Sequence, residues 1–277
     1  MRRFLRHRLA IVGVVLVATI VLLAILAPLL TPWAPNWIDF DTGARKPPSP
    51  AHVLGTDVSG RDIWARILYG GRTSTIVGFG AVGLYLIIGT ALGMLAGFYG
   101  GIIDQSIMRF TDTILAIPPL LLIIVFVSVV GPSIGSVIVV IALLGWPVTC
   151  RLVRGQLLVL REAEFITAAR VVGVPDRSIL LRHMLPNILG PITVVATFGV
   201  ATAVLLESSL SFLGLGVRPP EASWGNLITE ATSPVVLNQL WWQWMPAAVA
   251  ITATVLGVNF IGDGLRDAID PRTIKRG

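Results

Sequence analysis

Long apolar runs, separated by shorter polar stretches, fill almost the whole chain. Six of them are long enough to cross a bilayer as helices, at residues 9–30, 75–99, 102–130, 133–149, 187–214 and 245–261. A basic start precedes the first run, as in a signal peptide, but the run is long for one and no convincing cleavage site precedes Pro32. We therefore expect an all-α membrane protein of six transmembrane helices that retains its first helix.

Glycines recur at every fourth position of the second span, at Gly89, Gly93 and Gly97. Small residues at this spacing lie on one helix face, against which a neighbouring helix can pack closely in lipid. We interpret this stripe as a packing surface and not as a binding site.

Carboxylates inside the third and fifth spans need a partner or an aqueous surrounding at membrane depth. Asp112 lies three residues after Arg109 and can pair with it on one helix, and Pro118 begins a break just beyond. A role in an ion pathway is the alternative for Asp112. Glu207 is expected to be paired, protonated or beside an aqueous cavity, so both acids are candidates for path-lining or structural polar residues.

Two polar connections are expected on the outer side of the membrane. Residues 31–72 are rich in Pro and Gly and irregular, but residues 61–69 carry a helical stripe of apolar positions. This stripe predicts a short helix lying in the membrane interface, with a solvated loop as the alternative. Residues 215–239 form the second connection, and an interfacial aromatic belt follows it at Trp241, Trp242 and Trp244.

The longest polar insertion in the second half of the chain, residues 161–191, predicts two short helices. The first, at residues 162–172, has acids in its first turn and Gly173 where a C-terminal cap is expected. The second begins near Asp176 and ends at Pro186. One face of the first helix is mostly small and is therefore suited to close docking into a partner; it is formed by Phe165, Ala168, Ala169 and Val172.

The composition is typical of an integral membrane protein. Of the 277 residues, 55% are hydrophobic and 13% charged, and the mean hydropathy is +0.83. The net charge of +6 is carried almost wholly by Arg beside the apolar runs, so membrane topology explains it better than nucleic-acid binding, which is not expected. The single Cys150 excludes an intrachain disulfide and a cysteine metal cluster, and three isolated His residues argue against a histidine metal site.

The distribution of positive charge predicts the orientation in the membrane. With six spans and a cytoplasmic N-terminus, the 21 Lys and Arg residues divide into fifteen on the cytoplasmic side and six outside. This bias agrees with the positive-inside rule. It places both termini and the insertion at residues 161–191 in the cytoplasm.

No pattern of a common catalytic site is present. The chain has no GxxxxGK[ST] phosphate loop and no HExxH, CxxC or GxSxG motif. Ser211 has no histidine near it in sequence, and His183 is interpreted as a surface or packing residue. We therefore predict a non-catalytic conduit driven by a partner. An intramembrane enzyme, or a secondary transporter coupled through Asp112 or Glu207, is the alternative.

The insertion resembles the EAA loop of ABC-importer permeases, whose pattern is Glu-Ala-Ala, three residues, Gly, nine residues, Ile, any residue, Leu-Pro. The matching positions are Ala168, Ala169, Gly173, Leu185 and Pro186. Thr167 stands where the family often has Glu, and His183 where it often has Ile. Three further stretches, at residues 54–74, 205–216 and 259–272, look like the dipeptide, oligopeptide and nickel subfamily, in particular its second, C-type permease.

This resemblance implies a type I importer permease fold and a set of partners. A homologous second permease would complete the translocation path, two ABC ATPase subunits would bind below, and an extracytoplasmic binding protein would deliver the substrate. ATP and Mg²⁺ would be held by the ATPase subunits, so no cofactor is expected on this chain. The implied cargo is di- or oligopeptides, with nickel or a metal–chelator complex as the alternative.

The resemblance also implies which residues couple the chain to an ATPase. They are Glu162, Glu164, Phe165, Thr167, Ala168, Ala169, Arg170, Gly173, Leu185 and Pro186. The expected parts are residues 1–30 with the first span, 31–72 as the extracytoplasmic segment, 73–265 as the permease domain with its EAA loop at 161–187, and 266–277 as a tail. The expected location is a bacterial or archaeal inner (plasma) membrane, with both termini cytoplasmic.

Overall fold

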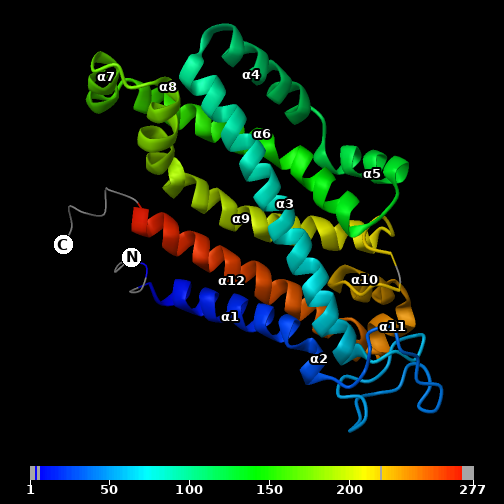
Figure 1. Cartoon of the computed structure of the whole chain (residues 1–277). Coiled ribbons are helices and arrows are strands. Elements are labelled where there is room, and N and C mark those ends of the chain that lie inside the picture. The colour runs from blue at the N-terminus through cyan, green and yellow to red at the C-terminus, as the bar shows by residue number, and fades with distance from the viewer. Residues whose placement is uncertain (1–3, 5–6, 219, 270–277) are drawn as a thin grey trace.

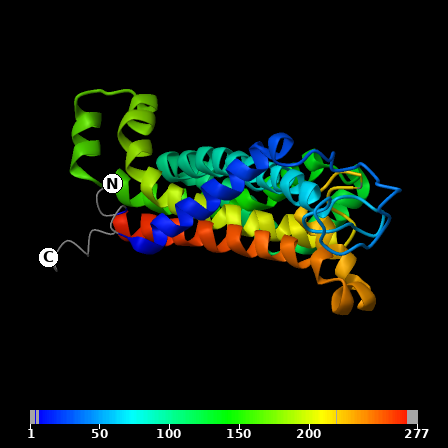
Figure 2. The same cartoon turned by 90° about the horizontal axis from the view of Figure 1, so that it is seen from below.

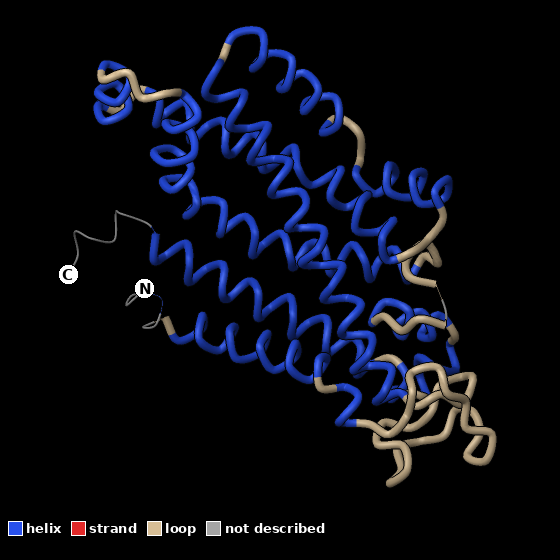
Figure 3. The backbone as a smooth tube through the Cα atoms, viewed as in Figure 1, coloured by secondary structure: helices blue, strands red, loops and turns tan. Residues whose placement is uncertain are grey.

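Five long helices run side by side through the molecule (Figure 1). They are α1 (Arg8–Ile25), α3 (Ile63–Tyr99), α6 (Ile134–Arg161), α9 (Leu185–Phe212) and α12 (Met245–Ile269). The structure is a computed structural model that describes residues 4, 7–218 and 220–269. The basic start at residues 1–3 and 5–6 and the tail at residues 270–277 lie outside the described residues. The described part has helices and loops but no strand, which confirms the predicted all-α class (Figure 3).

A broken helix supplies the remaining candidate span. α4 (Gly101–Leu115) and α5 (Pro119–Val130) are bent by 85° at a short break, and together they are long and apolar enough to cross a membrane. Pro118 lies in this break, where its ring and missing N–H end the helix as the sequence predicts. The described chain therefore has five candidate spans, or six when the bent pair is one span.

α3 is longer than the sequence analysis predicted. A separate interfacial helix at residues 61–69, and the alternative of a solvated loop, are both wrong because the helix runs unbroken from Ile63 to Tyr99. Asp62 begins it by accepting a hydrogen bond from the Ala65 N–H at 2.6 Å, as an N-cap residue does. Gly70 and Gly71 do not break it, because this part of the helix packs tightly against Trp224 and its neighbour.

Two other helices extend past their predicted spans. α6 begins after Ser133, which caps it through the Ser136 N–H, and continues to Arg161 rather than ending at residue 149. α12 continues to Ile269 rather than residue 261. The apolar pattern predicts only the part of a helix that lies in lipid, so the polar turns that project beyond it were not recognised.

The glycine stripe of α3 packs against α6, as predicted. A Cβ atom added at Gly89 would lie 2.6 Å from the Cβ of Thr149, and one at Gly93 would lie 2.6 Å from the carbonyl oxygen of Cys150. At Gly97 the nearest atom is the Leu157 Cβ, at 2.7 Å. Separations this short leave no room for a side chain, so the two backbones approach as closely as helices in lipid do.

The two ends of the bundle differ in character. One end, called the loop end because it carries the EAA-like loop at residues 161–187, holds both described chain ends and the short helix α7 (Glu164–Val171). The opposite end, called the far end, holds residues 31–62 with α10 (Trp224–Thr229) and α11 (Pro234–Gln239) (Figures 1 and 2). Many large apolar side chains between the two ends are exposed, including Ile87 and Val125. Such surfaces suit contact with lipid or with another subunit.

Residues 31–62 fold at the far end around the buried imidazole of His52. Its Nδ1 lies 2.8 Å from an Asp62 carboxylate oxygen and its Nε2 lies 3.1 Å from Asp39, while the ring of Trp33 stacks on it at 4.9 Å. Burial lowers the pKa of His52, but the two carboxylates outweigh it and hold this pKa above its ordinary value of 6.5. Since Asp62 also caps α3, this cluster ties the irregular segment to a span.

The close packing of α3 on α6 predicts that Gly93→Ala lowers stability while Gly83→Ala does not. A methyl group at Gly93 must displace backbone, which costs about 1–3 kcal/mol, whereas nothing lies within 4 Å of Gly83 on the same helix. The thermal unfolding midpoint of the purified protein in detergent measures the difference. Equal midpoints for the two variants would contradict this account of the helix pair.

The His52 cluster predicts a pH-dependent contribution to stability. Because the folded pKa lies above 6.5, the protonated imidazole stabilises the fold fully below pH 6.5 and loses this effect as the pH rises through the folded pKa. The unfolding midpoint of the wild type should therefore exceed that of His52→Gln most at pH 5.5, with the gap shrinking towards pH 8.5. A gap that is constant or widens with pH would refute the charged cluster.

Candidate functional site

The short helix α7 stands clear of the bundle at the loop end (Figure 2). It covers Glu164–Val171 and so begins two residues later than predicted. Gly173 follows with a φ of +80°, its N–H donating to the Arg170 carbonyl and the Val174 N–H donating to the Ala169 carbonyl, each at 3.0 Å. This pair of bonds is a Schellman motif, so the predicted C-terminal cap is present.

One buried side chain holds α7 to the spans. Ile166 is fully buried in an apolar cluster with Met94 and Phe98 of α3 and Leu157 of α6. Arg170 adds a cation–π contact, its guanidinium 5.5 Å from the centre of the Phe98 ring. α7 is therefore fixed to the ends of α3 and α6 even though most of its surface is free.

The opposite side of α7 presents an apolar surface without a cover. Phe165 is 47% exposed, Val171 83% and Val172 82%. Of the face predicted from the sequence, Ala168 is also exposed, but Ala169 is half-buried towards the bundle. Thr167, Glu162 and Glu164 are exposed around this surface, and Glu162 accepts a hydrogen bond from Arg161 at 3.2 Å.

Sequence reasoning missed two of the residues that matter here. Ile166 was not recognised as the anchor, and Val171 was not recognised as part of the free surface. Ile166 follows Phe165 directly in α7, and the sequence does not show which of the two large apolar side chains faces the spans. The exposure of Val171 depends on how α7 is rotated against the spans, which no local pattern specifies.

The second predicted helix of the insertion has a different form. α8 (Asp176–Ser178) passes into the π-helical turn η2 (Ile179–Met184) and then into α9, so the chain stays helical through Pro186. The prediction that the helix ends at Pro186 is wrong, as is the start of the fifth span at residue 187. Pro186 lies in the first turn of α9, where its missing N–H costs little, and the wide π-helical turn precedes it.

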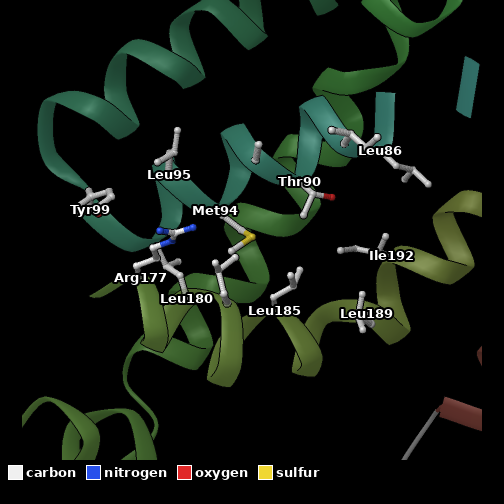
Figure 4. Close-up of a pocket in the computed structure, with 13 residues that line it drawn as sticks. Leu86, Thr90, Met94, Leu95, Tyr99, Arg177, Leu180, Leu185, Leu189 and Ile192 are labelled. Atoms are coloured by element: carbon white, nitrogen blue, oxygen red, sulfur yellow. The ribbon is translucent and has the colours of Figure 1, made fainter. Parts of the chain in front are cut away.

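A groove separates α8, η2 and the first turns of α9 from α3. It has a volume of about 690 Å³, and Figure 4 shows Met94, Leu95 and Tyr99 of α3 on one side and Leu180 and Leu185 on the other. Leu185 therefore points into the groove, while Pro186 next to it is exposed. The structure thus gathers the predicted residues from Glu164 to Gly173 on α7 and its cap, and it separates Leu185 and Pro186 from them.

Ion pairs tie the broken span to α6. Asp112 accepts a hydrogen bond from Arg151 of α6 and not from Arg109, so the predicted partner on its own helix is wrong. About two turns earlier in α4, Asp104 receives two hydrogen bonds from Arg154, both 2.6 Å long. A forked pair of this kind is specific as well as strong, so it fixes the position of α4 on α6.

Glu207 is fully buried among serines near the far end. Its carboxylate accepts hydrogen bonds from Ser211 at 2.8 Å and from Ser74 of α3 at 3.0 Å. The hydroxyl of Ser223, at the start of α10, lies 3.4 Å from that of Ser211. Glu207 therefore joins α9, α3 and the α10 segment, and serine hydroxyls, with no charged partner among the described residues, satisfy its carboxylate.

The fold defines a class, a helical membrane protein with a short helix that projects from one end of the bundle. A family model for the "Binding-protein-dependent transport system inner membrane component" matches residues 89–275, and one for the "N-terminal TM domain of oligopeptide transport permease C" matches residues 1–48. The chain belongs to the family of binding-protein-dependent transport system inner membrane components.

Known proteins agree with this assignment. A Brucella suis protein described as "Putative peptide permease protein" is 46% identical over 270 residues, 98% of this chain and 89% of its own length. The dipeptide transport system permease protein DppC of Alkalihalophilus pseudofirmus is 43% identical over 268 residues, covering 96% and 87%. The chain is therefore a permease subunit of an ABC importer and not an enzyme.

A solved structure has the same fold. In the MetNI methionine ABC transporter, captured in inward-facing conformations, a chain aligns with a TM-score of 0.59 at 18% identity, over 74% of this chain and 96% of that one. At this identity the likeness bears on the fold alone, which is that of a type I importer permease. The predicted fold class is confirmed.

Proposed function

We propose that this chain forms half of the translocation path of an ATP-driven peptide importer and receives the force of ATP binding through α7. The observation that carries the proposal is the two-sided character of α7, anchored to two spans by Ile166 and uncovered on its apolar side. A homologous second permease completes the path. Two ATPase subunits and an extracytoplasmic binding protein complete the importer.

α7 acts as a coupling helix because its anchor prevents it from moving alone. An ATPase groove that encloses Phe165, Ala168 and Val172 displaces α7 when ATP closes the two ATPase subunits. Packed side chains transmit such a displacement as a rigid shift, so the ends of α3 and α6 move with α7. ATP and Mg²⁺ stay on the ATPase subunits, and the permease shifts between states that differ in their contacts with them.

The loop end faces the cytoplasm in this proposal. Both described chain ends lie there with α7 (Figure 1), and the positive-inside bias of the sequence favours the same side. The far end, with residues 31–62 and α10, is then accessible to a binding protein outside.

A cavity supports the placement of the path. It has a volume of about 390 Å³ and lies where the broken span, α6 and α9 meet, with Phe198, Thr202 and Thr149 in its wall. The hydroxyl of Thr149 is buried without a hydrogen-bond partner among the described residues. Its oxygen is not exposed to the cavity, because the Thr149 side chain packs against Gly89 of α3, so it takes no part in the proposed path. Asp112 and Glu207 do not line this cavity.

The cargo class follows from the relatives, whose printed descriptions name peptide and dipeptide transport. Reconstitution of the complete importer in proteoliposomes should give uptake of di- or tripeptides that requires ATP, the ATPase subunits and the loaded binding protein. Uptake that persists without the ATPase subunits and follows an ion gradient would overturn the proposal. Uptake of nickel or a metal–chelator complex in place of peptides would overturn only the assignment of the cargo.

The cap of α7 gives a sharper prediction. Gly173→Val forces a β-branched residue to a φ of +80°, which strains the cap, although nothing lies within 4 Å of the glycine. Co-purification of the ATPase subunits should fall several-fold, and ATP-driven uptake should fall with it. The unfolding midpoint of the spans should stay close to that of the wild type.

Gly155→Val is the matched control, because Gly155 lies in α6 with equally free surroundings and a helical backbone. This variant should retain the ATPase subunits. Normal ATPase co-purification and normal uptake in Gly173→Val would reject the role of the cap in docking.

A further inference from the structure

A charged cavity at the far end has no part in the coupling described above. Its volume is about 310 Å³, and it lies between the start of α3 and the segment that joins α9 to α10. Its charged lining comes from Arg61, Arg66, Arg218 and Glu230, and Ser211, Asn226 and Thr229 add neutral polar groups. A cavity of this size suits a small ligand, at the lower limit of ordinary ligand sites.

The three arginines exceed the negative charge available to them locally. Asp57 accepts a hydrogen bond from the Arg61 Nε at 2.7 Å and lies 3.5 Å from the Arg66 Nε, so one carboxylate serves two guanidinium groups. Arg66 is only 2% exposed, and its Nε has no hydrogen-bond partner among the described residues. Arg218 is exposed and has no ion pair in the described part of the chain.

Glu230 supplies one negative charge to the same cavity. It begins the short 3-10 helix η3 (Glu230–Thr232), after α10, and is half-buried. Burial raises the pKa of the Glu230 carboxyl and the negative charge of Asp57 raises it further, while the positive charges of Arg66, Arg61 and Arg45 lower it. A cation bound beside Glu230 would add to the groups that favour its ionised form.

The floor of the cavity reaches the buried carboxylate of α9. Ser211 lines the cavity, and its hydroxyl donates to Glu207 at 2.8 Å. Glu207 also receives the Ser74 hydroxyl of α3. A ligand in the cavity would therefore contact the polar cluster that holds α3, α9 and α10 together.

We propose that this cavity binds the two charged ends of a short peptide, the carboxylate at Arg218 and Arg66 and the ammonium group at Glu230. Guanidinium groups bind carboxylates through paired hydrogen bonds, which gives the required orientation. The coexistence of both charges selects a zwitterion, since Glu230 would repel a phosphate and the arginines would repel a simple cation. This inference rests on the proposed function in peptide import, and it assigns a receiving site on this chain itself.

Direct binding without the binding protein tests the proposal. The complete importer in lipid nanodiscs is incubated with radiolabelled dialanine or trialanine, and unlabelled dialanine, dialanine amide and N-acetyl-dialanine compete. The free peptide should bind saturably. The amide and the acetylated form should compete about ten- to a hundredfold more weakly, as expected for loss of a charged hydrogen-bonding group.

Variants assign the contacts. Arg218→Gln should weaken peptide binding about tenfold or more, and Arg218→Lys should restore part of it. Glu230→Gln should remove the preference for the free ammonium group over the acetylated one. Lys46→Gln is the matched control, because Lys46 is an exposed cation in residues 31–62, at the same end of the molecule, that does not line the cavity; this variant should bind peptide like the wild type.

Three results would overturn the proposal: no saturable peptide binding, equal competition by dialanine and its amide, or wild-type binding by Arg218→Gln. If the Arg218→Gln importer bound the empty binding protein more weakly but still bound peptide normally, the cavity would be a docking site for that protein. This result would also overturn the proposal. Peptide uptake by the wild-type importer, measured in parallel, separates this failure from that of the proposed function. Uptake without binding in the cavity refutes the site only.

Discussion

The close approach of α3 to α6 is the contact on which the rest of the structure depends. It is possible because glycines on α3 leave no side chain between the two backbones, so that a Cβ at Gly93 would meet the Cys150 carbonyl oxygen at 2.6 Å. At the loop end the same pair of helices supplies the pocket for Ile166. At the far end the start of α3 carries Asp62, which caps the helix and pairs with His52. In lipid, where apolar burial does not drive helices together, such packing supplies much of the association.

In the proposed mechanism, this arrangement lets a displacement at one end reach the other. α7 is fixed to α3 and α6, and α9 is fixed to α3 through the buried Glu207 and its two serine donors. The helices α3, α6 and α9 between the two ends are each continuous, although α6 contains Pro147 and α9 contains Pro191. The break at Pro118 is the exception, and the paired bonds from Arg154 to Asp104 hold the first part of that broken span on α6.

Sequence reasoning predicted the parts of the fold that local chemistry determines. The apolar runs, the break at Pro118 and the cap at Gly173 follow from solvent and backbone preferences, and each is present. The errors concern tertiary context. The partner of Asp112 is on another helix. The chain stays helical through Pro186 because a π-helical turn precedes it, and no residue pattern predicts such a turn. For the same reason Ile166 was missed, since only the neighbouring spans decide which side of a short helix is buried.

The most direct test of the account asks whether α7 moves together with the end of α3. Spin labels at Val171→Cys on α7 and Tyr99→Cys on α3 would report their separation in the complete importer; both positions are exposed, and the native Cys150 is buried. We expect this distance to be the same in the nucleotide-free and ATP-bound states, while the distance between the coupling helices of the two permease subunits changes. A change in the Val171–Tyr99 distance on ATP binding would show that α7 moves independently of α3, and would contradict rigid coupling.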